Sequence, residues 1–103
     1  MPRDDHVMSD LSDGSFVIFG GFVNGSRVNE LAKFTMTNTQ TISGQVLQEC
    51  SNNQAQPQIR ASCSSCVYND KFYVFGGQDD DNGKLNDLWE FDCAGNSWRQ
   101  IQI

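Results

Sequence analysis

Two short runs of aromatic and β-branched residues stand out from the polar stretches of this chain. Phe16-Val17-Ile18-Phe19 and Phe72-Tyr73-Val74-Phe75 each end in a pair of glycines. This length and composition are typical of strands that are buried on both faces and end at a turn. The dipeptides Asp13-Gly14 and Asn69-Asp70 lie just before the two runs and favour tight turns. We therefore expect an earlier strand to fold back antiparallel onto each run.

The segments around each run supply further strands. We expect the earlier strands at His6–Ser9 and at Ala61–Tyr68. After the second run, Trp89 and Phe91 alternate with other positions, which predicts a third strand. A polar turn then leads to a fourth strand at Ser97–Ile101.

The corresponding segment after the first run, Val28–Phe34, fits two structures. Its apolar positions at Val28, Leu31 and Phe34 also suit a short helical stripe. The alternating pattern of its second copy favours a strand here. A fourth strand is expected near Ile42–Leu47.

The chain repeats its own pattern once. The double glycines begin at Gly20 and Gly76, which are 56 residues apart. Val28–Phe34 recurs as Leu85–Phe91 at an offset of 57, and the blocks keep their order. A period near 50 residues is typical of a tandem-repeat architecture.

Together these elements predict an all-β fold of two four-stranded antiparallel sheets. The first sheet is expected within residues 2–47 and the second within 57–103, with a polar connection at 48–56. Four-stranded sheets repeated in tandem are the pattern of β-propeller blades.

The repeated residues resemble the Kelch motif. In that family an Arg opens the repeat, often with a His three residues on, Gly-Gly ends an aromatic strand, an Asn-Asp-Leu-aromatic strand follows and a Trp closes the blade. The second repeat matches at Arg60, Gly76-Gly77, Asn86-Asp87-Leu88-Trp89 and Trp98, and departs at Cys63, where the His would stand. The resemblance covers nearly the whole chain. It implies two Kelch-type blades of an incomplete β-propeller, with the closing Trp packed between adjacent blades.

The first repeat departs from the motif at its closing residue. It keeps Arg3, His6 and Gly20-Gly21. Counting along the repeat places Thr41 or Ile42 where the Trp is expected. This loss of apolar bulk predicts weaker packing at that end of the blade.

Two blades are fewer than the roughly four to eight of a closed propeller. They would share one interface and leave two apolar sheet faces bare, whereas repeat arrays generally need at least about three units. The sequence favours a piece or a short member of a Kelch protein. The other possibilities are a truncated gene product and a piece that is completed by another chain, through self-association or through further blades.

Composition narrows the choice of partners. The chain has 13 acidic and 7 basic residues, a net charge of −6, and its basic residues are scattered, which argues against nucleic-acid binding. No apolar run approaches the roughly 18 to 20 residues of a membrane-spanning helix. Because the start of the chain lacks the apolar core of a signal peptide, we expect a cytoplasmic protein without membrane contact.

The chain offers little for catalysis or metal binding. Cys63 and Cys66 have the spacing of half a zinc site, but no second pair follows, and on a strand they would point to opposite faces. The single histidine, His6, has no nucleophile signature around it. We therefore predict no enzymatic activity, no cofactor and no metal site.

The loops after the double glycines are the candidate contact sites, since Kelch-like propellers usually bind partners at one rim. The second loop approaches the spacing of a calcium loop, but Gln78 and Trp89 fall where that pattern requires acidic ligands. We therefore interpret it as a solvated acidic turn. The candidate partner-binding residues are Phe22, Val23, Asn24, Arg27, Asp79, Asp80, Asp81 and Lys84.

These observations favour a non-catalytic protein-interaction module that contacts a protein partner through rim loops. The alternative is a part of a Kelch-fold propeller enzyme, because the resemblance extends to copper oxidases and sugar-processing enzymes. A copper site needs several imidazole or tyrosine ligands, and the chain offers His6, Tyr68 and Tyr73.

Overall fold

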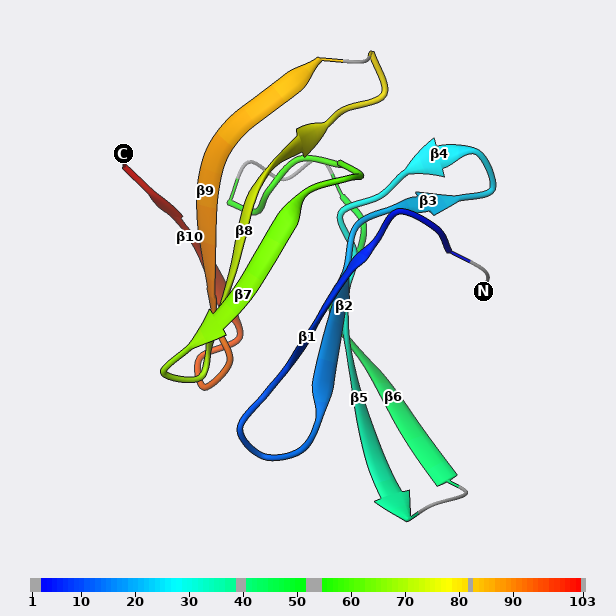
Figure 1. The fold of residues 1–103 in the computed structure, drawn as a ribbon, viewed down its shortest axis with the longest axis vertical. Coiled ribbons are helices and arrows are strands. Elements are labelled where there is room, and N and C mark those ends of the chain that lie inside the picture. Colours follow the sequence, from blue (N-terminus) through cyan, green and yellow to red (C-terminus); the bar gives the residue numbers. More distant parts are fainter. Residues whose placement is uncertain (1–2, 39–40, 52–54, 82, 103) are drawn as a thin grey trace.

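A computed structural model describes residues 3–38, 41–51, 55–81 and 83–102, and the regular structure within them is entirely β-strand (Figure 1). Two four-stranded antiparallel sheets and one two-stranded hairpin are present. Within the described ranges, no helix could span a membrane. The strands are β1 (Val7–Asp10), β2 (Phe16–Phe19), β3 (Phe22–Val23), β4 (Ser26–Arg27), β5 (Leu31–Asn38), β6 (Thr41–Gln48), β7 (Ser64–Tyr68), β8 (Lys71–Gln78), β9 (Lys84–Asp92) and β10 (Ser97–Ile101).

Each sheet is an antiparallel meander, as the sequence predicts. Blade 1 has the order β1-β2-β5-β6, and blade 2 has the order β7-β8-β9-β10. The β3–β4 hairpin is inserted between β2 and β5 and was not expected from the sequence. Residues 52–54 of the predicted connection lie outside the described ranges.

The strand registers show that the two blades are built alike. Phe16 lies opposite Phe34 on β2 and β5, just as Phe72 lies opposite Phe91 on β8 and β9. The segment from Leu31 onward is therefore a strand, and the helical alternative is wrong. Its side chains gain neighbours on β2 and β6 that an isolated helical stripe would lack.

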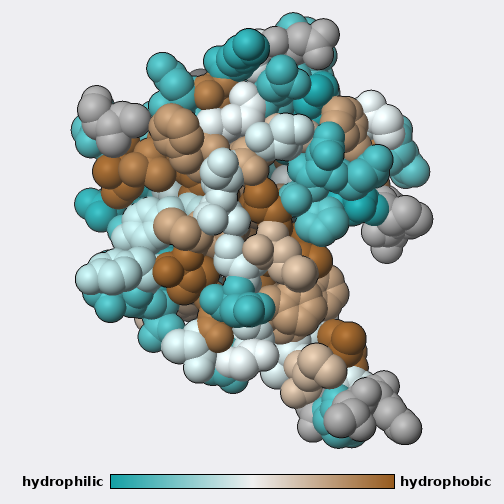
Figure 2. Space-filling model, in the orientation of Figure 1, coloured by the Kyte–Doolittle hydropathy of each residue, from teal (hydrophilic) through white to brown (hydrophobic). Residues whose placement is uncertain are grey.

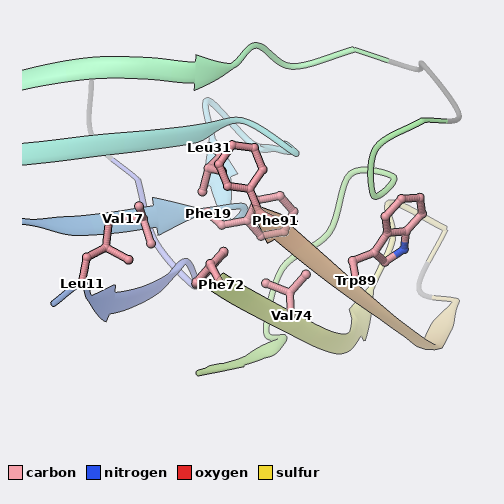
Figure 3. Close-up of a cluster of buried hydrophobic side chains, with 8 residues drawn as sticks. All are labelled: Leu11, Val17, Phe19, Leu31, Phe72, Val74, Trp89 and Phe91. Atoms are coloured by element: carbon pink, nitrogen blue, oxygen red, sulfur yellow. The ribbon is translucent and has the colours of Figure 1, made fainter. Parts of the chain in front are cut away.

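The hydrophobic core lies between the blades (Figure 3). Aromatic rings join the two sheets: Phe19 of β2 lies 5.3 Å from Trp98 of β10, measured between ring centroids, and 6.4 Å from Phe72 of β8. We call the facing surfaces the inner faces. The buried apolar residues of this core are Leu11, Val17, Phe19 and Leu31 from blade 1 and Phe72, Val74, Trp89 and Phe91 from blade 2.

The central strands are buried on one face, so the expectation of burial on both faces is wrong for this chain. Val17 and Phe19 alternate with half-buried residues in β2, and Phe72 and Val74 do so in β8. Phe75, next along β8, is 45% exposed. The reason is that each blade has a neighbouring sheet on its inner face alone.

The structural counterpart of Trp98 in blade 1 is Gly44, which corrects the expectation of Thr41 or Ile42. Trp98 lies opposite Phe91 in the β9–β10 pair, and Gly44 lies opposite Phe34 in the β5–β6 pair. The β5–β6 hairpin is longer and has a register shift near its tip, so counting along the chain misplaces the position.

The double glycine at Gly20-Gly21 is required by the backbone. Both residues have positive φ, of 72° and 94°. A Cβ atom on Gly21 would lie 2.5 Å from the carbonyl oxygen of Asp4, and one on Gly20 would lie 2.8 Å from that of Arg60. The glycines therefore let the start of each repeat cross closely over the end of β2.

Candidate interaction surface on the blade rim

The first candidate loop forms the β3–β4 hairpin. Phe22 pairs with Arg27 and Val23 with Ser26. The turn residues Asn24 and Gly25 have positive φ, of 53° and 83°, as the two-residue turn of a tight hairpin demands. An Asn-Gly pair between short strands is the sequence signal for such a hairpin, so it was present in the chain.

The hairpin is held against the start of the chain. The Phe22 amide donates a hydrogen bond of 2.7 Å to the Asp4 carbonyl oxygen, and the Asp4 amide returns one to Phe22. The guanidinium carbon of Arg27 lies 4.4 Å from the centroid of the Phe22 ring. Phe22 and Val23 are half-buried, so they largely support their own loop.

The second candidate loop is organised by Asp79. Its Oδ1 accepts hydrogen bonds from the amides of Asp81, at 3.0 Å, and Gly83, at 2.8 Å. A carboxylate bound in this way shapes a turn and has less capacity to contact a partner. Asn82 of this loop lies outside the described ranges.

The structure brings the two loops together, although they are more than 50 residues apart in the sequence. Asp80 Oδ1 accepts a hydrogen bond of 3.0 Å from the Arg27 amide and lies 3.5 Å from the Arg27 guanidinium. The Arg27 side chain is 12% exposed, whereas that of Asp80 is 44% exposed. This contact joins residues from both blades into one surface, and the sequence alone did not indicate it.

We call this the rim surface: the β3–β4 hairpin together with the β8–β9 loop. Figure 2 shows hydrophilic residues gathered at this end of the molecule. Among the candidates, Asn24, Asp80, Asp81 and Lys84 are exposed, so the surface presents an amide and charges of both signs. Such a surface can form hydrogen bonds and ion pairs with a partner.

Two arginines, Arg60 fully buried and Arg3 half-buried, support the strand ends near this rim. Arg60 is fully buried and donates to both carboxylate oxygens of Asp87, at 2.7 and 2.9 Å, and to the Gly76 carbonyl at 3.1 Å. In blade 1, Arg3 forms an ion pair with one carboxylate oxygen of Glu30 and donates to the Gly20 carbonyl. Both arginines are thus paired with groups at strand ends, so they are not available as an anion site.

The environment of Asp87 lowers its pKa. Burial raises the pKa of Asp87, but the hydrogen bonds from Arg60 and Trp89 outweigh this effect, so its pKa lies below its ordinary value. Asp87 therefore remains charged and bound to Arg60 at neutral pH.

The cysteine, histidine and tyrosine side chains that are candidates for metal or redox chemistry lie apart. Cys63 precedes β7 and packs against the core, whereas Cys66 is exposed on β7, and burial raises the pKa of the Cys63 thiol. Within the described part of the chain, no three His, Cys, Asp or Glu side chains are grouped to hold a metal ion. His6 lies beside blade 1, while Tyr68 and Tyr73 lie on blade 2.

Two four-stranded antiparallel blades packed face to face, with loops at one rim, define the class of β-propeller repeat proteins. A family model, the KLHDC2/KLHL20/DRC7 Kelch-repeats domain, matches residues 1–103. The chain belongs to the Kelch-repeat family, which confirms the resemblance seen in the sequence.

Three relatives match nearly the whole chain. Kelch domain-containing protein 1 of Mus musculus is 31% identical over 102 residues, which are 98% of this chain and 24% of that protein. Its human counterpart is also 31% identical, over 97% of this chain and 23% of that protein. Leucine-zipper-like transcriptional regulator 1 homolog of Drosophila melanogaster is 26% identical over 93% of this chain and 10% of that protein. The chain therefore spans about a quarter or less of the length of these relatives.

Proposed function

We propose that this chain is a non-catalytic protein-interaction module that binds a protein partner through the rim surface. The observation that carries the proposal is the contact between Arg27 and Asp80, which joins the loops of both blades into one polar surface on a rigid β-scaffold. Membership of the Kelch-repeat family supports it, because Kelch-repeat domains generally serve as interaction or adaptor modules.

The mechanism is recognition by shape and polar contacts. Asn24 and Lys84 supply donors, and Asp80 and Asp81 supply acceptors. The loops need little reordering to bind, because Asp79 and the Arg27–Asp80 contact fix them beforehand. A protein partner with complementary charges suits this rim better than a nucleic acid, given the net charge of −6.

Two further features belong to the proposal. The location is cytoplasmic, which is supported by the four cysteines, all of which are free thiols. The blade surfaces that are separate from the rim are completed by self-association or by further blades.

The enzyme alternative is the weaker interpretation. Its candidate copper ligands within this chain, His6 and the two tyrosines, lie on different blades. Tyr73 is already engaged, because its hydroxyl donates a hydrogen bond of 2.7 Å to Glu90.

A charge-reversal pair tests the rim surface. Asp81→Lys changes the sign of an exposed rim residue, and Asp10→Lys makes the same change at the opposite end of blade 1, where β1 ends. Proteins captured by the immobilised chain are quantified by mass spectrometry for both variants and the unchanged chain. We expect Asp81→Lys to lose at least one binding protein that Asp10→Lys retains, because rim charges set association rates and pairing. Identical capture by the two variants would contradict the proposal.

A further inference from the structure

The exposed apolar side chains are not scattered over the molecule. Every large hydrophobic residue that is strongly exposed in the described ranges lies on the blade faces that point away from the core, which we call the outer faces. Figure 2 shows such residues near the far ends of β5 and β6. They are Met8, Met36, Ile42 and Val46 on blade 1, at 47–58% exposure, and Tyr68 and Phe75 on blade 2, at 68% and 45%.

The interface inside the chain shows what such faces bind. Blade 1 presents Val17, Phe19 and Leu31 to blade 2, which receives them with Phe72 and Phe91 among others. The two sides of this interface differ, so it is heterologous. Blade 1 contributes the presenting face, and blade 2 contributes the receiving face.

The strand registers show that each outer face is one half of the same interface. On blade 2, Phe75 pairs with Leu88 as Phe19 pairs with Leu31. The outer face of blade 2 therefore corresponds to the inner face of blade 1, which is the presenting face. On blade 1, Phe16 pairs with Phe34 as Phe72 pairs with Phe91. The outer face of blade 1 therefore corresponds to the inner face of blade 2, which is the receiving face.

The outer face of blade 1 carries smaller side chains than the inner face of blade 2, to which it corresponds. Where the inner face of blade 2 carries Trp89 and Trp98, the outer face of blade 1 carries Ala32 and Gly44. The result is a hollow of about 420 Å³ on the outer face of blade 1. Its lining includes Ile18, Ala32, Phe34, Gly44 and Val46.

The opposite change occurs on the outer face of blade 2. Tyr73 stands where blade 1 has the smaller Val17, and Phe75 stands where it has Phe19. A face with larger side chains therefore matches a face with a hollow, and both belong to this chain. Two close-packed sheets require this kind of complementarity.

The buried carboxylate of the larger face, Glu90, is already paired. The Tyr73 hydroxyl donates to Glu90, and Arg99 donates to the same carboxylate at 3.2 Å. The hydrogen bond from Tyr73 lowers the pKa of Glu90, which keeps it charged. Covering this face leaves no unpaired acid beneath the partner.

We propose that a second copy of this chain binds head to tail, with the outer face of blade 2 packed on the outer face of blade 1 of the next copy. Phe75 then lies against Phe16 and Gly44 of that copy, as Phe19 lies against Phe72 and Trp98 within the chain. Because about four to eight blades close a propeller, a ring formed from this two-blade chain alone would hold two to four copies. This surface is distinct from the rim surface and does not depend on it.

Two variants block the two faces separately. Phe75→Asp places a charge on the outer face of blade 2, and Val46→Asp places one beside the hollow on blade 1; both positions are exposed, so the fold is expected to tolerate them. Sedimentation velocity of the unchanged chain should show a species of two to four copies. Each variant alone should sediment as a monomer.

Mixing the variants gives the decisive result. Each retains one intact face, so an equimolar mixture of Phe75→Asp and Val46→Asp should form a two-chain complex and grow no further. Asn24→Asp, which adds the same charge on the rim, should associate like the unchanged chain. Near-ultraviolet dichroism of Trp89 and Trp98, which lie in the core, checks that each variant is folded. Phe75→Ser or Val46→Ser replaces the aspartate variant at the same position if that variant is not folded.

Three outcomes would overturn the proposal. The first is a monomeric unchanged chain. The second is association that survives both aspartate variants. The third is a mixture of folded variants that stays monomeric, or a variant at one face that still forms dimers, because an interface between two identical faces would behave in that way.

Discussion

At the scale of single residues, the ion pair between Arg60 and Asp87 is the one whose loss should lower the free energy of unfolding most. Arg60 is fully buried and Asp87 is its carboxylate partner, with two short hydrogen bonds between them. Exposed pairs such as Lys33 with Asp13 have solvent around both groups. Removal of a partner matters most where the remaining charge has no water to replace it.

We expect Asp87→Asn to lower the free energy of unfolding by about 3 kcal/mol, because it leaves the Arg60 charge buried and poorly compensated. Lys33→Ala, which breaks the exposed pair, should cost less than about 1 kcal/mol. Urea unfolding of both variants and the unchanged chain measures the difference. Equal losses would contradict the structural role of Arg60.

The pKa of Asp13 makes a second prediction at this scale. The side-chain and backbone hydrogen bonds from Ser15 lower it from an ordinary value of 3.8 to about 2. Because the folded pKa is depressed, the stabilisation by Asp13 is complete above the ordinary value and is lost as the pH falls toward 2. The stability difference between the unchanged chain and Asp13→Asn should therefore shrink over that window. NMR titration that gives an ordinary pKa for Asp13 would disprove this.

At the scale of elements, the position of the β3–β4 hairpin depends on the glycine that precedes it. Gly21 combines a positive φ with close contact to the Asp4 carbonyl. Gly25, in the hairpin turn, also has a positive φ but has no neighbour within 4 Å of its Cβ position. A substitution at Gly25 therefore measures the cost of the backbone conformation alone, whereas one at Gly21 adds the cost of the steric contact.

Gly25→Ala should cost about 1–2 kcal/mol, the penalty of a left-handed conformation for alanine. Gly21→Ala should cost clearly more and should also displace the hairpin, since the backbone must move to accept the new methyl group. Thermal unfolding gives the first result, and amide exchange of Phe22 and Asp4 gives the second. A Gly21→Ala variant no less stable than Gly25→Ala would contradict the close contact.

The elements also show how far the sequence predicts the structure. Strands with a strong apolar pattern, such as Phe16–Phe19, lie where the sequence placed them, because their pattern reflects burial directly. The counterpart of Trp98 was misplaced, because the length of the β5–β6 hairpin decides the register and counting cannot reveal it. The β3–β4 hairpin was overlooked although Asn24-Gly25 signals it, because its strands are short.

The candidate site was predictable in part. The loops after the double glycines could be named, but the contact between Arg27 and Asp80 depends on how the blades pack, which no local pattern contains. The supporting role of Asp79 likewise became apparent from the hydrogen bonds within its loop.

At the scale of the whole molecule, the packing of the two blades determines which surfaces are buried and which loops meet. It buries the inner faces, brings the rim loops together and leaves the outer faces open. Further polar contacts across the blades, such as that between the hydroxyls of Ser9 and Ser65 at 2.9 Å, fix the relative position of the sheets. The central claim is therefore that the two repeats share one core.

The most direct test of this claim is a nuclear Overhauser measurement between the rings of Phe19 and Trp98 in the purified chain. These residues belong to different repeats, and their ring centroids are 5.3 Å apart. We predict strong cross-peaks between the two rings, together with cross-peaks between the rings of Phe19 and Phe72. Sharp, dispersed spectra in which both blades are folded but these cross-peaks are missing would contradict the account.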